Sequence, residues 1–232
     1  SSDVCSSDLA IVGLDTRATM DLDTTIRGLT LTHEAIQTMF TEICAIIVAD
    51  DVQFELVDIS DIRENDDYPG IRVALKASYP PIGVPLTVDV TTGDMITPHE
   101  VEYTFPLLFD DRTICIFAYN METVFAEKLE TVLSRNIANT RPRDYYDIHI
   151  LYVLRYAECD KAVLRKALER TTQKRGSSMI LTEYPEIMEK ICESDTLYRR
   201  WEKYRREYDY AKDISFDDTC NSIQTIMNEI MV

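Results

Sequence analysis

Apolar and polar residues alternate over two neighbouring segments of the first half of the chain. Residues 70–79 and 84–90 both follow this pattern, which is typical of strands with one buried face. Residues 80–83 between them contain two prolines and a glycine, which predict a turn. The two segments are therefore predicted to be antiparallel neighbours in one sheet, with Asp89 on the polar face of the second.

One amphipathic helix is predicted early in the chain. Thr30 or Thr32 can cap its first turn, and we expect it to end near Ala49. Its apolar residues recur at intervals of three and four, so that one face is expected to join the core. These residues are Ile36, Met39, Phe40, Ile43, Ile46 and Ile47.

Further strands are predicted at residues 11–26, where a turn divides the segment, at 52–59 and at 113–118. The acidic residues 58–67 predict a turn. After 113–118 the apolar residues follow helical spacing to the end of the chain. The predicted fold is α+β: a mixed or antiparallel sheet with an early helix, followed by a helical C-terminal half.

Residues 1–9 differ in composition from the rest of the chain. They are rich in serine and aspartate and show no strand, helix or signal-peptide pattern. We expect them to be a non-native addition and exclude them from the fold. The native sequence would then begin near Ala10, within an element and without a methionine, so we expect the natural protein to continue upstream.

The negative charge of the protein lies in its first half. The net charge is −17, and residues 10–111 carry 19 acidic but only 5 basic side chains. A nucleic-acid surface is therefore expected only in the second half. Basic residues at 155–175 and 199–206, the latter interleaved with Tyr198, Trp201 and Tyr204, suit an RNA end. Charged outer faces of ordinary amphipathic helices explain them as well.

The cellular setting is indicated by cysteines and hydropathy. The six cysteines are widely spaced and form no Cys-x-x-Cys pair, which favours free thiols in a reducing cytosol. No apolar run is long enough to span a membrane. We therefore expect a cytoplasmic protein with no membrane partner.

Two aspartates, Asp21 and Asp23, lie two residues apart in a segment with strand character. Alternate residues of a strand share a face, so their carboxylates are expected side by side. A divalent cation, most often magnesium, would compensate their charge, whereas a solvated edge strand or turn would need none. If the strand of Asp89 pairs beside theirs, three carboxylates and two magnesium ions would form a phosphoryl-transfer site. A surface position explains Asp89 alone equally well.

Two predicted helices carry further candidate residues. Lys128 and Arg135 lie two turns apart on one helical face, which suits phosphate binding, although weak surface ion pairs are the alternative. Asp144 and Asp147 are neighbours in the first turn of a helix that begins near Pro142. The helix dipole favours anions there, so a well-capped helix start also accounts for both.

Together these segments resemble the AbiEii/AbiGii toxin family of nucleotidyltransferases, which share the DNA-polymerase-β-like nucleotidyltransferase fold. The similarity covers about residues 10–150. The family has a Gly-Gly-Ser/Thr-like turn upstream of its Asp-x-Asp, which in this protein would lie before Ala10. The matching segments are Arg17–Asp23, Tyr68–Arg72 leading into Leu86–Asp89, Glu122–Arg135 and Arg141–Asp147.

The resemblance implies a toxin of a bacterial toxin–antitoxin or abortive-infection (phage-defence) pair. Such an enzyme would transfer nucleotides from a nucleoside triphosphate to RNA, expected to be the tRNA acceptor end, and would have a cognate antitoxin. Lys128, Arg135 and Arg72 would bind the triphosphate, and two Mg²⁺ ions would bind to the three carboxylates of the sheet. By motif, the catalytic residues would be Asp21, Asp23, Asp89, Lys128 and Asp144.

The resemblance also implies a domain organisation. Residues 10–119 would form a nucleotidyltransferase sheet domain without its N-terminal part, and residues 120–232 a helical region that completes the active-site cleft. Without the upstream turn this chain is expected to be poorly active. Two alternatives remain: a non-catalytic nucleotide-binding or interaction module whose acidic half docks a basic antitoxin, and a phosphotransferase that uses the same metal site.

Overall fold

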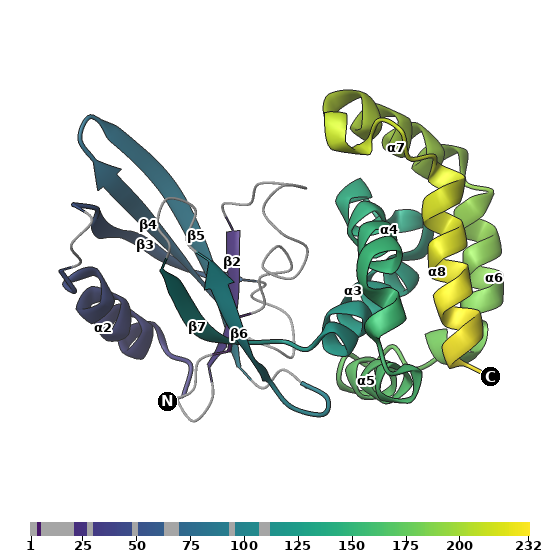
Figure 1. The fold of residues 1–232 in the computed structure, drawn as a ribbon, viewed down its shortest axis with the longest axis horizontal. Coiled ribbons are helices and arrows are strands. Elements are labelled where there is room, and N and C mark those ends of the chain that lie inside the picture. Colours follow the sequence, from purple (N-terminus) through teal and green to yellow (C-terminus); the bar gives the residue numbers. More distant parts are fainter. Residues whose placement is uncertain are drawn as a thin grey trace. The chain divides into compact units, whose positions relative to one another are not determined.

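The computed structural model of the protein describes residues 4–5, 21–26, 30–47, 51–62, 70–92, 96–106 and 112–232. These residues divide into two compact units. The sheet unit contains all the described strands and helix α2, and the helical unit contains residues 120–232 together with 96–100 (Figure 1). This arrangement confirms the α+β class predicted from the sequence, with one early helix among the strands and a helical C-terminal half.

The sheet unit contains a mixed sheet with the strand order β3-β4-β5-β2-β1-β7-β6. Strand β2 pairs with β5 in parallel, and so does β1 with β7, while the other neighbours are antiparallel. The strands are β1 (Val4–Cys5), β2 (Asp21–Ile26), β3 (Gln53–Ile62), β4 (Gly70–Tyr79), β5 (Ile82–Thr92), β6 (Val101–Pro106) and β7 (Thr113–Ala118).

The predicted hairpin of β4 and β5 is confirmed. The chain turns at Pro80 and Pro81, and the register pairs Val73 with Val88. Both valines are buried on the face that carries the core, whereas Asp89, next to Val88, belongs to the other face.

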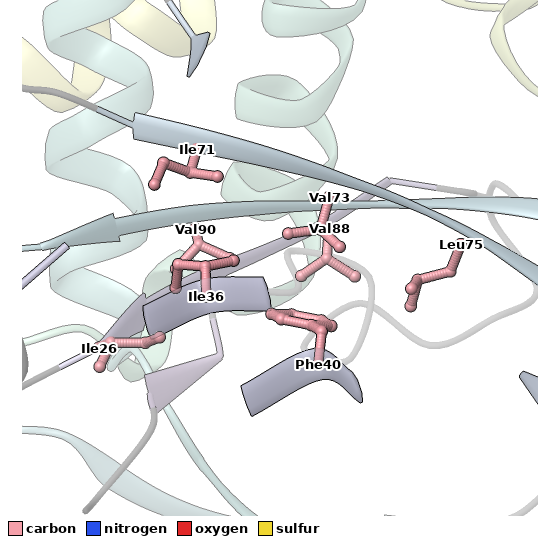
Figure 2. Packing of buried hydrophobic residues seen from close by; sticks show 8 residues of the cluster. All are labelled: Ile26, Ile36, Phe40, Ile71, Val73, Leu75, Val88 and Val90. Atoms are coloured by element: carbon pink, nitrogen blue, oxygen red, sulfur yellow. The ribbon is translucent and has the colours of Figure 1, made fainter. Parts of the chain in front are cut away.

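Helix α2 (His33–Cys44) covers the apolar face of this part of the sheet. Thr32 caps it by accepting a hydrogen bond from the amide of Ala35 at 3.2 Å, as one of the two predicted caps. Figure 2 shows Ile36 and Phe40 of α2 directed at valine and isoleucine side chains of the strands. The buried cluster consists of Ile26, Ile36, Phe40, Ile71, Val73, Leu75, Val88 and Val90.

The predicted helix was too long. It ends at Cys44 and not near Ala49, and Ile46 and Ile47 are 64% and 97% exposed. Apolar spacing indicates which face of a helix is buried, but it does not indicate where the neighbouring sheet ends. The β-branched residues after Ala45 have low helix propensity, which favours an end to the helix there.

One further prediction about the strands was wrong, and one strand was missed. Strand β3 continues to Ile62, whereas a turn was predicted from Asp58; it is the first strand in the sheet order, and edge strands tolerate charged side chains such as Asp58 and Asp61. Strand β6 was not predicted at all. Residues 11–20 and 63–67 lie outside the part of the chain that the structure describes.

Residues 1–9 were expected to form no strand, yet Val4–Cys5 form β1 between β2 and β7. Strand pairing uses main-chain groups, which almost any residue other than proline supplies, so composition alone could not exclude it.

In the described part of the helical unit, α-helices pack on one another through buried apolar residues. Helix α3 lies against α4, α5 and α6, and α8 lies against α4, α5, α6 and α7 (Figure 1). Asn120 caps α3, and Pro142 is the first residue of α4, as the sequence predicted. Among the described residues, no helix is both long and apolar enough to cross a membrane. The helices are α3 (Met121–Arg135), α4 (Pro142–Arg155), α5 (Lys161–Lys174), α6 (Ile180–Cys192), α7 (Asp195–Glu207) and α8 (Phe216–Ile230).

Candidate functional site

Three charged residues form a row across neighbouring strands of the sheet unit. Asp23 of β2 is in register with Asp89 of β5, and Asp89 is in register with Arg72 of β4. Two residues further along β2 and β5, the hydroxyls of Thr25 and Thr91 lie 3.0 Å apart. Because alternate residues share a face, Asp23 and Asp89 share the face of these threonines. Asp23, Asp89 and Arg72 are termed the charged row.

Asp21 precedes Asp23 by two residues in β2 and is in register with Thr87. Its side chain lies outside the described part of the structure. The strand of Asp89 does pair beside the Asp-x-Asp strand, as the three-carboxylate interpretation requires. That these aspartates bind metal remains a prediction.

Asp89 is bound through both carboxylate oxygens to the guanidinium of Arg72. Arg72 Nε donates to Oδ1 at 2.8 Å and Arg72 Nη2 donates to Oδ2 at 2.7 Å. The Arg72 side chain is 51% exposed and that of Asp89 is 18% exposed. This pairing was not predicted, although the register of the predicted hairpin could have indicated it. With Tyr79 opposite Ile82, Arg72 lies seven residues before the turn and Asp89 seven after it.

The three carboxylates fit a divalent cation by their chemistry and strand positions. Carboxylate oxygens are the ligands that Mg²⁺ prefers, and Asp23 and Asp89 occupy adjacent positions on one face. Among the described side chains, which do not include that of Asp21, no three histidine, cysteine, aspartate or glutamate residues are grouped so that they could hold a metal ion. Because Arg72 donates to both oxygens of Asp89, a cation that used Asp89 would share these oxygens with the guanidinium or displace it.

In the helical unit, Lys128 and Asp147 form an ion pair between α3 and α4. Lys128 Nζ donates to Asp147 Oδ2 at 2.9 Å, and the two side chains are only 15% and 10% exposed. Lys128 is thus not the solvated surface residue of the alternative interpretation. Asp147 was not among the predicted site residues; its spacing from Asp144 placed it on the same turn but did not reveal its partner.

Asp144 is buried at the start of α4, with 5% of its surface exposed. Arg141 Nε lies 3.6 Å from its Oδ1, and its Oδ2 accepts no hydrogen bond within the described residues. A capped helix start at the surface would leave this carboxylate in water, so that alternative does not account for the burial of Asp144. Buried carboxylate oxygens are normally satisfied, and an exception points to a bound water, a ligand or a functional role.

Two more unpartnered polar atoms lie close to Asp144 in the sequence. They are Asn139 Nδ2 and Tyr145 OH. Within the described residues, these two atoms and Asp144 Oδ2 are the buried side-chain nitrogen and oxygen atoms that have no hydrogen-bond partner. Burial, with smaller contributions from Cys220 and Asp144, raises the pKa of Tyr145, so its hydroxyl stays protonated. A small cavity beside them is lined by Asn139, Pro142, Tyr145, Leu197, Arg200, Trp201 and Phe216.

Arg135, the second predicted phosphate ligand of α3, is half-buried and makes no ion pair with any residue that the structure describes. It ends the helix that carries Lys128. The prediction that the helical region, with Lys128 and Asp144, completes the active-site cleft involves both units and remains a prediction.

Part of the RNA surface predicted at residues 199–206 is buried in the structure. Trp201 is 1% exposed and donates from Nε1 to the carbonyl of Ile214 at 3.1 Å, so it is not available for base stacking. Arg200 donates to the carbonyl of Asn139 at 2.6 Å. Alternation of basic and aromatic residues could not distinguish the buried face of α7 from its outer face. The basic residues that remain exposed are Arg199, Lys203 and Arg206.

Comparison with known proteins identifies the family. Residues 9–222 match the family model described as nucleotidyl transferase AbiEii toxin, type IV TA system. No curated protein gives a match. The structure resembles the crystal structure of JHP933 from Helicobacter pylori, with 12% identity, a TM-score of 0.48 and coverage of 98% of this chain and 84% of that one.

A second H. pylori structure, described as a "putative nucleotidyltransferase", has 13% identity and a TM-score of 0.46, with coverage of 99% of this chain and 86% of that one. Both likenesses are too distant to transfer residue roles. The family model, in contrast, matches nearly the whole sequence. The protein therefore belongs to the AbiEii family of nucleotidyl transferase toxins of type IV toxin–antitoxin systems.

Proposed function

We propose that this nucleotidyltransferase transfers a nucleotide from a nucleoside triphosphate to RNA, at the acceptor end of tRNA, with Mg²⁺ held by Asp21, Asp23 and Asp89. The observation that carries the proposal is a strand register. Asp23, which lies two residues after Asp21 in β2, is in register with Asp89 of β5. It places carboxylate-bearing positions on adjacent strands, which is the donor set that a divalent cation needs. When bound, the cation would neutralise the triphosphate and polarise the phosphoryl group that is transferred.

Lys128 is proposed to bind the triphosphate, and Arg135 to add a second positive charge on the same helix. Asp147 then acts as a positioning residue, because its carboxylate holds the ammonium of Lys128 at 2.9 Å. A lysine held in one place loses less conformational entropy when it meets a phosphate.

Asp144 is proposed to contact the reacting groups. Its Oδ2 is buried and unpartnered in the described structure, so it can accept a hydrogen bond from a substrate hydroxyl or an ordered water. A carboxylate in this state is suited to general-base chemistry, which requires a free acceptor oxygen close to the proton that is removed.

The outer face of α7 is proposed to contact the RNA backbone. Arg199, Lys203 and Arg206 follow one another at intervals of four and three, so they line one face of the helix, and all three are exposed. In a protein of net charge −17, such a stripe offers a local site for phosphates. The proposed setting is the cytoplasm, where the toxin would block translation during phage defence until its antitoxin counteracts it.

The proposal is tested by incubating the protein with Mg²⁺, total tRNA and each nucleoside triphosphate, labelled in parallel at the α- or the γ-phosphate. Nucleotide transfer puts the α-label on RNA, and prior periodate oxidation of the tRNA 3′ diol should prevent it. Transfer of the γ-label would instead indicate a phosphotransferase. If neither label were transferred, the non-catalytic module would be the better interpretation.

A further inference from the structure

The contact between Arg72 and Asp89 lies where the proposed function places a cation. The guanidinium fork engages both oxygens of Asp89, and Asp23 lies in register on the other side. Neighbouring strands are about 4.8 Å apart, so the carboxylates of Asp23 and Asp89 repel unless a positive charge compensates them. In the structure Arg72 supplies a compensating charge, and it does so at the position of one predicted metal ligand.

Arg72 cannot resolve a competition with a cation by losing its own charge. A guanidinium stays protonated in proteins, so a divalent ion bound to Asp89 would face a fixed positive charge close by. The repulsion between the two positive charges is relieved if Arg72 moves away from the cation or if an anion binds between them. The Arg72 side chain is 51% exposed, so it can leave Asp89 without entering a buried environment.

The triphosphate is the anion that suits this exchange. The planar donors of arginine match phosphate oxygens as well as they match a carboxylate, and two phosphate contacts can replace two contacts to Asp89. We infer that Arg72 holds Asp89 in the absence of ligands and passes to the triphosphate when metal and nucleotide bind, which couples the two binding events. This inference rests on the proposed function, because it requires the metal to bind Asp89.

Coupling of this kind makes two predictions of opposite sign. Without nucleotide, the cation competes with the fixed positive charge of Arg72 for Asp89, so removing Arg72 should strengthen metal binding. The nucleotide, in contrast, loses a ligand, so the same change should weaken triphosphate binding. A merely structural role of Arg72 would weaken both, because damage to the sheet would affect every ligand.

The test measures Mn²⁺ binding to the full chain without nucleotide, from the electron paramagnetic resonance signal of the free ion. Arg72→Gln should bind Mn²⁺ at least about fivefold more tightly than the wild type, the lower end of typical coupling. Lys76→Gln is the matched control, because Lys76 is an exposed cation four residues along the same strand and face. It should change Mn²⁺ affinity by less than about twofold, since it lies about 13 Å from Arg72 along the strand.

Equilibrium dialysis with each labelled nucleoside triphosphate, in Mg²⁺, supplies the second readout. Arg72→Gln should weaken binding at least about fivefold, and Lys76→Gln should weaken it by less than about twofold. Arg72→Lys, which keeps the charge but lacks the two-pronged contact, should give an intermediate Mn²⁺ affinity. It also carries the test if circular dichroism shows that Arg72→Gln does not fold.

The outcomes separate this inference from the proposed function. If the wild type binds Mn²⁺ but Arg72→Gln and Arg72→Lys differ from it no more than Lys76→Gln does, the exchange is refuted and the metal site stands. If Arg72→Gln weakens the binding of both metal and nucleotide, Arg72 is structural and the exchange is likewise refuted. If the wild type binds no Mn²⁺ at all, the proposed metal site fails and this inference fails with it.

Discussion

The ion pair of Asp89 in the sheet unit and the ion pair of Asp147 in the helical unit differ in their surroundings. Arg72 lies 2.7 Å from Asp89 in the sheet unit, and Lys128 lies 2.9 Å from Asp147 in the helical unit. The cation of the first pair is 51% exposed and that of the second only 15%. Water competes for the first pair, whereas separating the second would leave a charge with little solvent.

The difference indicates different roles at similar distances. A pair whose cation is exposed contributes about 0–1 kcal/mol, and its cation can exchange partners at little cost. A buried pair resists the loss of one member, because the remaining charge loses its close counter-ion and has little solvent around it. We therefore expect the pair of Arg72 to take part in ligand exchange, and the pair of Lys128 to fix a side chain in place.

The largest expected effect is on the stability of the helical unit. Lys128→Met should lower its free energy of unfolding by about 3 kcal/mol, the lower end for a broken buried pair because both side chains keep some exposure. Urea unfolding followed by tryptophan fluorescence measures this directly, since the one tryptophan, Trp201, is buried in that unit.

The double variant Lys128→Met/Asp147→Leu is the control for this experiment. It removes both charges and should recover most of the lost stability, while triphosphate binding stays weak. If Lys128→Met were as stable as the wild type, the pair would not be the fixed element that the comparison requires.

The exposed pair should respond much less. Arg72→Gln should change the free energy of unfolding by less than about 1 kcal/mol. The reason is that water solvates Asp89 once the guanidinium is gone. Thermal unfolding followed by far-ultraviolet circular dichroism measures this change. A loss as large as that expected for Lys128→Met would remove the distinction between the two pairs.

The helix caps sharpen the comparison of the two units. Ser215 accepts from the amide of Asp218 at 3.0 Å, and Asp218 accepts from the amide of Ser215 at 2.9 Å, whereas Thr32 of α2 accepts one bond. Ser215→Ala should therefore cost about 1 kcal/mol in denaturant unfolding, and Thr32→Ala no more than that.

This cap should also depend on pH. Hydrogen bonds from Ser215 hold the pKa of Asp218 below its ordinary value. The resulting stability is present above that ordinary value and is lost as the pH falls through the lowered pKa. The cost of Ser215→Ala should accordingly shrink in acid; a cost that stayed constant down to about pH 2 would contradict the assignment.

The smallest effect concerns His149 of α4. Burial lowers its pKa, against an opposing contribution from Asp218, and its Nδ1 lies 2.8 Å from Ser222 Oγ. The unfolded chain therefore takes up the proton first, so stability should fall as the pH drops below about 6.5. His149→Gln should flatten the stability profile between about pH 7 and pH 5, and an unchanged slope would exclude His149 as its source.

Local patterns predicted much of the fold correctly. Alternation with a turn at Pro80 and Pro81 identified the hairpin, and Asn120 and Pro142 marked two helix starts, because strand faces, turns and caps depend on residues close in the sequence. The end of α2 at Cys44 was missed, since it depends on where the sheet stops beneath the helix.

The ion pairs could not be predicted in the same way. The partner of Lys128 depends on how α3 packs on α4, and helical spacing indicates only which residues share a face. The burial of Trp201 likewise depends on α8 and on the loop at Ile214, which accepts its hydrogen bond. Motif resemblance identified the family, but the contacts of its residues required the three-dimensional structure.

The most direct test of the account is α-label transfer to tRNA by Asp23→Asn, compared with the wild type over a range of Mg²⁺ concentrations. The substitution keeps the size of the side chain but removes a charged metal ligand, so we expect the loss of Mg²⁺-dependent transfer with an unchanged circular dichroism spectrum. Full transfer by Asp23→Asn at the same Mg²⁺ concentration would contradict the claim that the carboxylates of the sheet are the catalytic centre.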